Sequence, residues 1–310
     1  MANPLFEATF DSPLLSGTSY RREGASVETE TIAGRTALKS HLDRDDSAVR
    51  SEFMPLGMDR SEFTAAGSQT ANAKLGNTYE YDAKIYIPED WEKDSTPEIL
   101  MQWHDFPDSG ESWKNPAAAL QIQPGRDGDG RFVLETHADA SRITPSGGSN
   151  RYDSKESFDL GDVSSAIGEW TDWKFKIKWG YTDDTGSMEV WRDGKRVVNE
   201  QNMATAFNDE HGPYWKLGVY KWAWGGGGDT GADSRTYYYD DIRISSAGKS
   251  AQSADAPAEA FAPMEAAPAD AFTFDGLGFD TAPDPAGEQA VTLSGVQPLP
   301  PADLQAMLMA

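Results

Sequence analysis

The sequence contains no cysteine and no long apolar run. Among its 310 residues there are 0 Cys, which excludes a disulfide framework, thiolate metal sites and a cysteine nucleophile. No stretch of about 18 apolar residues is present, so we expect no membrane-spanning helix and no membrane partner. Residues 1–17 lack a basic segment followed by an apolar one, so no ordinary signal peptide is predicted. Secretion without such a peptide is our expectation, and residence in the cytoplasm is also compatible with the sequence.

Positive charge is scarce as well. The chain has 27 Lys and Arg against 51 Asp and Glu, which gives a formal net charge of −24. The field of so acidic a protein repels phosphate backbones, so we expect no nucleic-acid partner. A site for any polyanion must therefore be a local cluster of basic residues.

Helical periodicity is almost absent, whereas alternation of polar and apolar residues is frequent. The strand-like segments are residues 77–88 (NTYEYDAKIYIP), 98–104 (EILMQWH), 170–179 (WTDWKFKIKW) and 214–222 (YWKLGVYKW). Asp193-Gly194 adds the signature of a tight hairpin. Roughly ten to fourteen short strands predict an all-β fold, a sandwich or jelly roll, for residues 1–247.

Residues 248–310 differ in composition from the rest of the chain. Ala, Pro and Asp dominate this segment, and aromatic residues are few. Such a composition buries too little apolar surface to offset the entropy of ordering. We therefore predict a disordered, acidic C-terminal tail that follows the β domain.

The segment 214–222 places an unusual set of side chains on one face. Because successive side chains of a strand point to opposite faces, Tyr214, Lys216, Tyr220 and Trp222 share one side. The opposite side is mostly apolar and suits a core. A row of one cation, two phenols and an indole resembles the floor of a groove, in which Trp222, like Trp113, could stack on a sugar ring.

Two further segments carry polar residues on one strand face. The tetrad Arg-Ser-Glu-Phe occurs twice, at residues 50–53 and 60–63, and offers its Arg and Glu to the same side. Candidate groove residues from the tetrads are thus Arg50, Arg60 and Glu62. In the segment 98–104, Gln102 and His104 also share a face.

Arg, Gln, His, Lys and Tyr lining one sheet suit the β-elimination of a uronic acid polysaccharide. Arg and an amide can neutralise the sugar carboxylate, so that the enolate that develops is stabilised. A base must then remove H5, for which His104 is suitable, and a Tyr held near cations could also ionise. A Tyr phenol can protonate the departing O4.

These motifs resemble those of known polysaccharide lyases. Arg-Ser-Glu-Phe, Gln102-Trp103-His104 and the segment YWKLGVY are similar to the three signatures of family 7 alginate lyases. The stretch 173–198 resembles the family 20 glucuronan lyases and the heparin-lyase-I-like group. The resemblance covers roughly residues 6–244 and implies a β-jelly roll, a concanavalin-like sandwich of two antiparallel sheets.

The resemblance also implies roles for particular residues. Gln102 would neutralise the carboxylate together with the motif arginine, and Lys216 would contact the substrate. Tyr220 would be the catalytic acid, or both acid and base, and His104 a base or a carboxylate ligand. We prefer Arg60 as the motif arginine, because it lies closer in sequence to Gln102, and Arg50 remains the alternative. Tyr214 has only a supporting place in the groove.

The configuration of the sugar determines which side chain acts as the base and which acts as the acid. In glucuronate and mannuronate, H5 and O4 lie on one side of the ring, so Tyr220 could serve as both base and acid. In guluronate they lie on opposite sides, so His104 would be the base and Tyr220 the acid. The sequence does not choose between these substrates.

No cofactor is required for this chemistry, although related folds hold a structural Ca²⁺, for which Asp11 and Asp241 are candidate ligands. The expected partner is an acidic polysaccharide, bound by a monomer. The alternative function is a non-catalytic carbohydrate-binding module or lectin on the same fold. A glycoside hydrolase is disfavoured, because no strand carries the paired carboxylates that it needs.

Overall fold

The computed structural model describes residues 4–11, 19–25, 27–46, 48–56, 71–125, 130–144, 152–226 and 230–246. These residues all fall in one compact unit. The predicted tail 248–310, Arg60 and Glu62 also lie outside the described residues. No helix of the described residues is long and apolar enough to cross a membrane.

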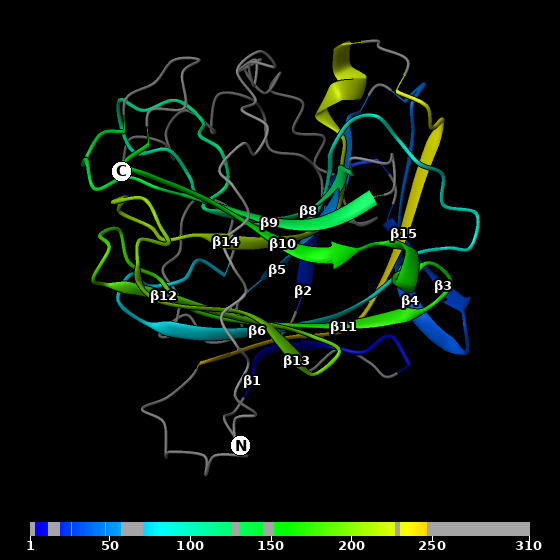
Figure 1. Cartoon of the computed structure of the whole chain (residues 1–310), viewed down its shortest axis with the longest axis horizontal. Helices are drawn as coiled ribbons and strands as arrows, with labels where there is room; N and C mark the ends of the chain where they lie inside the picture. The colour runs from blue at the N-terminus through cyan, green and yellow to red at the C-terminus, as the bar shows by residue number, and fades with distance from the viewer. Residues whose placement is uncertain are drawn as a thin grey trace, which may run out of the picture. The chain divides into compact units, whose positions relative to one another are not determined.

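Two antiparallel sheets form the fold, and Figure 1 shows them as two layers. The all-β prediction of a two-sheet jelly roll is therefore confirmed. The larger sheet, sheet A, has the order β13-β12-β11-β6-β15-β4-β3, with β1 paired to β15. Its strands are β1 (Pro4–Ala8), β3 (Val27–Ile32), β4 (Arg35–Asp43), β6 (Thr78–Tyr86), β11 (Trp170–Lys178), β12 (Gly186–Arg192), β13 (Lys195–Met203) and β15 (Ser234–Ser246).

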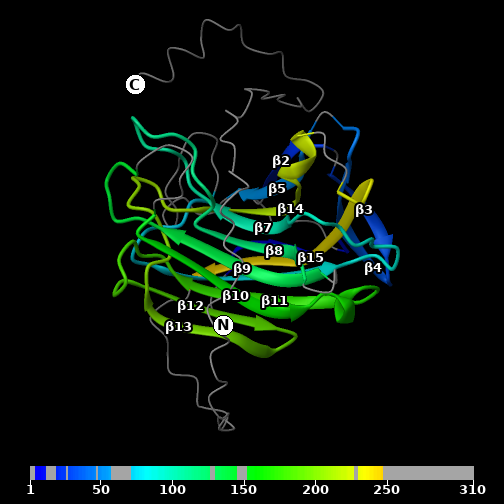
Figure 2. The ribbon, with the colours of Figure 1, turned by 45° about the horizontal axis from the view of Figure 1, so that its top comes forward.

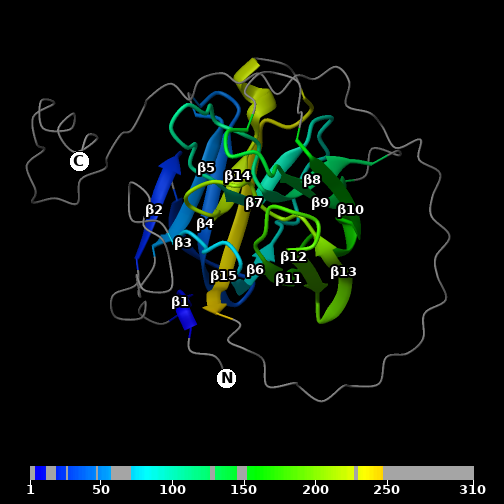
Figure 3. The ribbon, with the colours of Figure 1, turned by 90° about the vertical axis from the view of Figure 1, so that its left-hand side faces the viewer.

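The second sheet, sheet B, has the order β10-β9-β8-β7-β14-β5-β2, which can be followed in Figure 2. Its strands are β2 (Ser19–Gly24), β5 (Arg50–Leu56), β7 (Glu98–His104), β8 (Ala118–Pro124), β9 (Gly130–Ala138), β10 (Ser154–Asp162) and β14 (Tyr214–Tyr220). Two short 3-10 helices, η1 (Ser164–Ala166) and η2 (Trp222–Gly226), complete the described elements. Strands β5 and β7, distant in sequence, flank β14 in the middle of this sheet (Figure 3).

Aromatic residues from both sheets fill the core between the layers. Trp103 of β7 and Trp215 of β14 are cross-strand partners with stacked rings, whose centroids are 5.9 Å apart. Tyr81 of β6 meets both indoles edge-on from sheet A. Large aromatic side chains bury much apolar area each, so these contacts fix the two central strands of sheet B against sheet A. Because the apolar residues of each alternating strand point into this core, the polar residues between them face away from it.

Gly218 lets β14 and β5 approach each other closely. Its φ is +133°, and a Cβ built on it would lie 2.2 Å from the carbonyl oxygen of Ser51. No other residue fits this position, because a side chain would collide with the backbone of β5. The group that approaches this glycine is therefore the neighbouring strand, which brings Arg50 and Glu52 beside the polar row of β14.

Candidate active site

Strands β7 and β14 bring four of the predicted residues together. His104 is the cross-strand partner of Tyr214, and Gln102 is the partner of Lys216. The residues between them, Trp103 and Trp215, point into the core, so these four side chains share the opposite face of sheet B. The sequence predicted this shared face for each strand alone. It did not reveal that the two strands are neighbours.

The other edge of β14 supplies the arginine. Arg50 of β5 is the partner of Tyr220, and its guanidinium carbon lies 4.4 Å from the centre of the Tyr220 ring. The structure thus places Arg50, the alternative arginine, in the site, whereas the preferred Arg60 lies outside the described residues. His104 and Gln102 of β7, Lys216 and Tyr220 of β14, and Arg50 of β5 form one row of polar side chains on this face, the active-site row. It begins at His104 and ends at Tyr220. A row of this kind suits a polymer rather than a small molecule.

Carboxylates pair with both cations of the site. The Lys216 ammonium lies 2.8 Å from Glu23 Oε2 and 3.4 Å from Glu52 Oε2. Glu23 also pairs with Arg50, at 2.6 Å, and Glu52 accepts a hydrogen bond from the Gln102 amide. Lys216 is 2% exposed and Glu52 is 0% exposed. The predicted wet face is therefore buried at its centre, because ion partners from β2 and β5 cover Lys216.

Glu23 was missed by the sequence reasoning. It lies in β2, whose sequence SYRREG has adjacent charged residues and no clear alternation, so no face could be assigned to it. Burial by itself would raise the pKa of the Glu23 carboxyl, but Lys216 and Arg50 outweigh burial and lower that pKa to about 2. The pKa of Lys216 is raised in turn, because Glu52 and Glu23 outweigh its burial. Lys216 and Arg50 therefore both stay positively charged.

Removing the charge of Glu23 should destabilise the fold above pH 4.5. The folded pKa of about 2 lies below the ordinary value of 4.5, which the carboxyl has in the unfolded chain. The contribution of Glu23 to stability is therefore fully present above the unfolded pKa and is lost as pH falls through the folded pKa. At pH 7 we expect Glu23→Gln to lower the free energy of unfolding by about 2–3 kcal/mol. Denaturant titrations across pH measure this difference, which should shrink between pH 4.5 and pH 2.

The exposed Glu28 of β3 provides the control for this variant. Glu28→Gln should change the free energy of unfolding little at any pH, since exposed ion pairs contribute about 1 kcal/mol at most. A Glu23→Gln difference that does not depend on pH would contradict the assigned ion pairs.

The ring of His104 is held in one orientation. Its Nδ1 lies 2.9 Å from the carbonyl oxygen of Asp105, and since a carbonyl only accepts, Nδ1 carries the proton. Burial and the neighbouring Lys216 lower the pKa of His104 to about 3. The neutral ring therefore keeps a lone pair on Nε2, which can accept a proton or a hydrogen bond.

Tyr220 is a protonated phenol at neutral pH. Burial raises its pKa above the ordinary value, and Arg50 opposes that rise. The side chain thus has a proton to give, and the guanidinium over its ring would stabilise the phenolate that remains. The prediction that Trp222 continues the strand face is wrong, because β14 ends at Tyr220 and Trp222 begins η2. The Trp222 ring nevertheless lies edge-on to the ring of Tyr220, with the two ring centroids 5.7 Å apart.

Aromatic residues border the His104 end of the row. Phe106 stacks on Tyr214 with ring centroids 4.7 Å apart. Trp113 lies edge-on to the His104 ring, with ring centroids 5.4 Å apart. Trp113 is 44% exposed, which leaves one of its faces available for a sugar ring. Tyr214 is buried and stacks against Phe106, and its supporting place in the groove stays a prediction.

The two candidate calcium ligands already have other partners. Asp241 pairs with the Arg35 guanidinium at 2.6 Å, and the same guanidinium pairs with Asp240. An oxygen of Asp11 accepts the backbone N–H of Thr36. Because a guanidinium supplies the positive charge at this place, Asp11 and Asp241 do not fit a calcium site, and we derive no role for a metal from them.

The sequence model of the polysaccharide lyase family matches residues 18–243. An endo-β-1,4-glucuronan lyase from the fungus Trichoderma reesei is similar in structure, with a TM-score of 0.55, 19% identity, and coverage of 74% of this chain and 90% of that one. The binding domain of botulinum neurotoxin serotype C1 follows with a TM-score of 0.47 and 12% identity, over 78% of this chain and 48% of that one. No sequence among the curated proteins matches this chain.

Proposed function

This chain belongs to the polysaccharide lyase family, and on that basis we propose that it cleaves a 1,4-linked polyuronate, glucuronan or alginate, by β-elimination. Family membership makes the protein an enzyme of the lyase class acting on a polysaccharide, as predicted, and not a non-catalytic module. The observation that supports the finer proposal is the shared face of sheet B, on which Arg50, Gln102 and Lys216 lie between the phenol of Tyr220 and the imidazole of His104. The structurally similar fungal enzyme is a glucuronan lyase, which supports the same substrate class.

Recognition of the uronate carboxylate rests on directed hydrogen bonds. Glu23 and Glu52 balance the charges of Arg50 and Lys216, so the site has no large positive field of its own. A guanidinium has five N–H donors, so Arg50 can serve Glu23 and a substrate carboxylate together. With the Gln102 amide beside it, Arg50 stabilises the negative charge that grows on the carboxylate as H5 leaves.

The elimination breaks one C–H bond and one C–O bond. The base takes H5 as a proton, the electron pair forms the C4–C5 double bond, and the C4–O4 bond breaks. Tyr220 gives its phenolic proton to O4, so a hydroxyl end and a 4,5-unsaturated uronate end result. These side chains supply both the charge and the proton transfers, so the proposal requires no cofactor.

The base follows from the sugar. With glucuronate or mannuronate, H5 lies on the side of O4, so Tyr220 serves as both base and acid. Its phenol first loses its proton to solvent, the phenolate beside the Arg50 guanidinium takes up H5, and the same proton then passes to O4. With guluronate, H5 faces the other side of the ring, and Nε2 of His104 is the group with a lone pair to take it. We further propose that the enzyme acts as a monomer and outside the cell, where a polymer too large to cross a membrane is found.

A panel of polyuronates tests the substrate and the base together. The unsaturated end absorbs in the ultraviolet, so absorbance should rise with glucuronan, polymannuronate or polyguluronate. His104→Asn should lower kcat by about 100-fold on guluronate, where it removes the base, and much less on glucuronate. His137→Asn, which changes a histidine of β9 outside this row, is the control. The absence of any absorbance rise across the panel would contradict the proposed reaction.

A further inference from the structure

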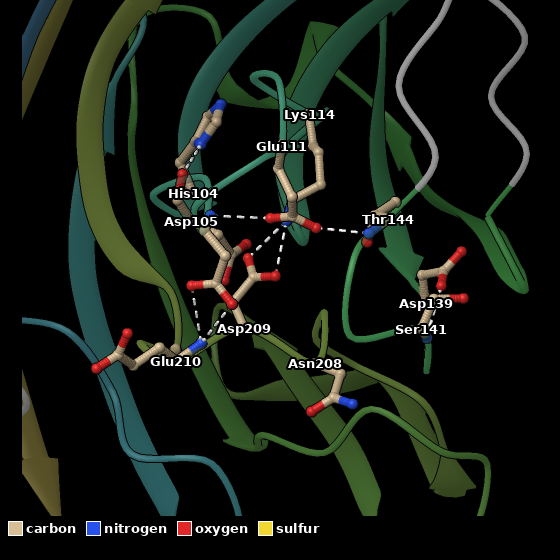
Figure 4. A network of polar contacts seen from close by, with 12 residues as sticks. His104, Asp105, Glu111, Lys114, Asp139, Ser141, Thr144, Asn208, Asp209 and Glu210 are labelled. Atoms are coloured by element: carbon tan, nitrogen blue, oxygen red, sulfur yellow. Dashed lines mark hydrogen bonds and ion pairs between the residues drawn. The ribbon is translucent and has the colours of Figure 1, made fainter.

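A group of carboxylates lies beside the site, on the loop that follows β7. Asp108 and Glu111 of this loop and Asp209, which precedes β14, each place one oxygen within 4.8 Å of the others. Figure 4 shows Glu111 and Asp209, which come from two segments that are distant in sequence, with their carboxylates close together. Oxygen atoms this close can share one cation, because ligands on opposite sides of a Ca²⁺ ion lie about 5 Å apart.

Asp105 provides a second, independent observation. It is only 2% exposed, and neither of its carboxylate oxygens has a hydrogen-bond partner. Its side chain is directed toward Asp209 and the rest of the cluster (Figure 4). Buried polar groups are nearly always satisfied, so two unpartnered carboxylate oxygens aimed at three other carboxylates indicate a missing partner that carries positive charge.

The positive charges present do not balance the cluster. The Lys114 ammonium lies 2.7 Å from both Glu111 and Asp209. Arg142 pairs with Asp108 from the surface, where its side chain is 59% exposed. Four carboxylates therefore face one buried and one exposed cation, and Asp105 has neither as a hydrogen-bonding partner. An excess of buried negative charge is costly unless another positive charge enters.

We propose that Asp105, Asp108, Glu111 and Asp209 bind one Ca²⁺ ion. Calcium prefers six to eight hard oxygen ligands in flexible geometry, and this cluster offers carboxylates only, with no His or Cys. Asp105, Asp108 and Glu111 recur every third residue in the loop, and Asp209 completes the set from the adjacent segment. Lys114 competes with the ion, because its ammonium occupies oxygens of Glu111 and Asp209.

The ion would hold the loop against the active-site row. The backbone oxygen of Asp105 accepts the hydrogen bond of His104, and the same loop carries Phe106 and Trp113. A cation shared by Asp105, Glu111 and Asp209 ties this loop to the segment that leads into β14. Its role is thus to position Phe106 and Trp113 beside His104 and Tyr214, and no step of the elimination passes through it.

Binding is tested on the full chain after treatment with a chelator. Isothermal titration calorimetry with Ca²⁺ should show one equivalent bound, with Mg²⁺ bound more weakly, since Mg²⁺ demands stricter octahedral geometry. At a hundredfold excess of Ca²⁺ over its Kd, the midpoint of thermal unfolding should rise by about 5 °C. Neither measurement depends on lyase activity, so the result stands whether or not the proposed reaction is correct.

Three variants test the assignment of the ligands. Asp105→Asn should weaken binding by at least about tenfold, whereas Asp183→Asn, which alters an exposed turn carboxylate, should leave it unchanged. Lys114→Met removes the competing ammonium, so it should bind Ca²⁺ more tightly and show a larger rise in the unfolding midpoint. If neither the wild type nor Lys114→Met binds Ca²⁺, the proposal is wrong and Lys114 with protons neutralises the cluster. Equal binding by Asp105→Asn would also overturn it.

Discussion

Tyr220→Phe should lower kcat for polyuronate cleavage by about a thousandfold while oligouronate binding persists. The change removes one oxygen, and with it the proton that O4 must receive, so the loss falls in the range typical of a general acid. The aromatic ring remains under the Arg50 guanidinium, so the fold and the binding groups are kept. Initial rates of ultraviolet absorbance measure kcat, and calorimetry with an oligouronate measures Kd.

Tyr181→Phe is the matched control for this variant. Tyr181 is an exposed tyrosine in the turn before β12, far along the chain from the polar row, so the same loss of a hydroxyl should have no effect there. A Tyr220→Phe variant that retains more than about a tenth of the wild-type kcat would remove Tyr220 from the role of acid.

Lys216→Met should have the largest effect on stability. It leaves Glu52 without its ammonium partner at a position that is 0% exposed. Breaking a buried ion pair in this way costs about 3–5 kcal/mol, because the remaining carboxylate keeps only the neutral Gln102 amide as a partner and loses the ammonium that balanced its charge. We expect this decrease in the free energy of unfolding at pH 7, measured by denaturant titration.

The double variant Lys216→Met with Glu52→Gln separates stability from function. Removing both charges of the pair should restore part of the lost free energy of unfolding, since burying a neutral amide at position 52 costs less free energy than burying an unpaired carboxylate. Lyase activity should stay low, because Arg50 and Gln102 lose the neighbours that hold them. If the single variant is as stable as the wild type, the buried charge network is assigned incorrectly.

The strands were predictable from the sequence because their periodicity is local. Segments 98–104 and 214–220 alternate within themselves, and the alternation correctly placed Gln102 and Lys216 on the face opposite to the core tryptophans. Which strands are neighbours was not predictable, because cross-strand register depends on packing between distant segments. The adjacency of Gln102 and Lys216 is therefore a result of the structure.

The choice of arginine illustrates the same limit. Arg60 was preferred because it lies closer along the chain to Gln102, and since it is outside the described residues that preference stays a prediction. Pairing in an antiparallel sheet follows register rather than distance along the chain. The register places Arg50 opposite Tyr220. Burial of Lys216 was also missed, because its covering partner Glu23 lies in a strand without alternation.

A crystal structure of Tyr220→Phe with a bound oligouronate tests the central claim most directly. We expect one sugar carboxylate to lie within hydrogen-bonding distance of Arg50 or Gln102, with the scissile O4 over the ring of residue 220. H5 of the same sugar should face residue 220 for glucuronate, or His104 for guluronate. An oligosaccharide bound elsewhere, such as on the outer face of sheet A, with the row on β14 empty, would contradict the assignment of this site.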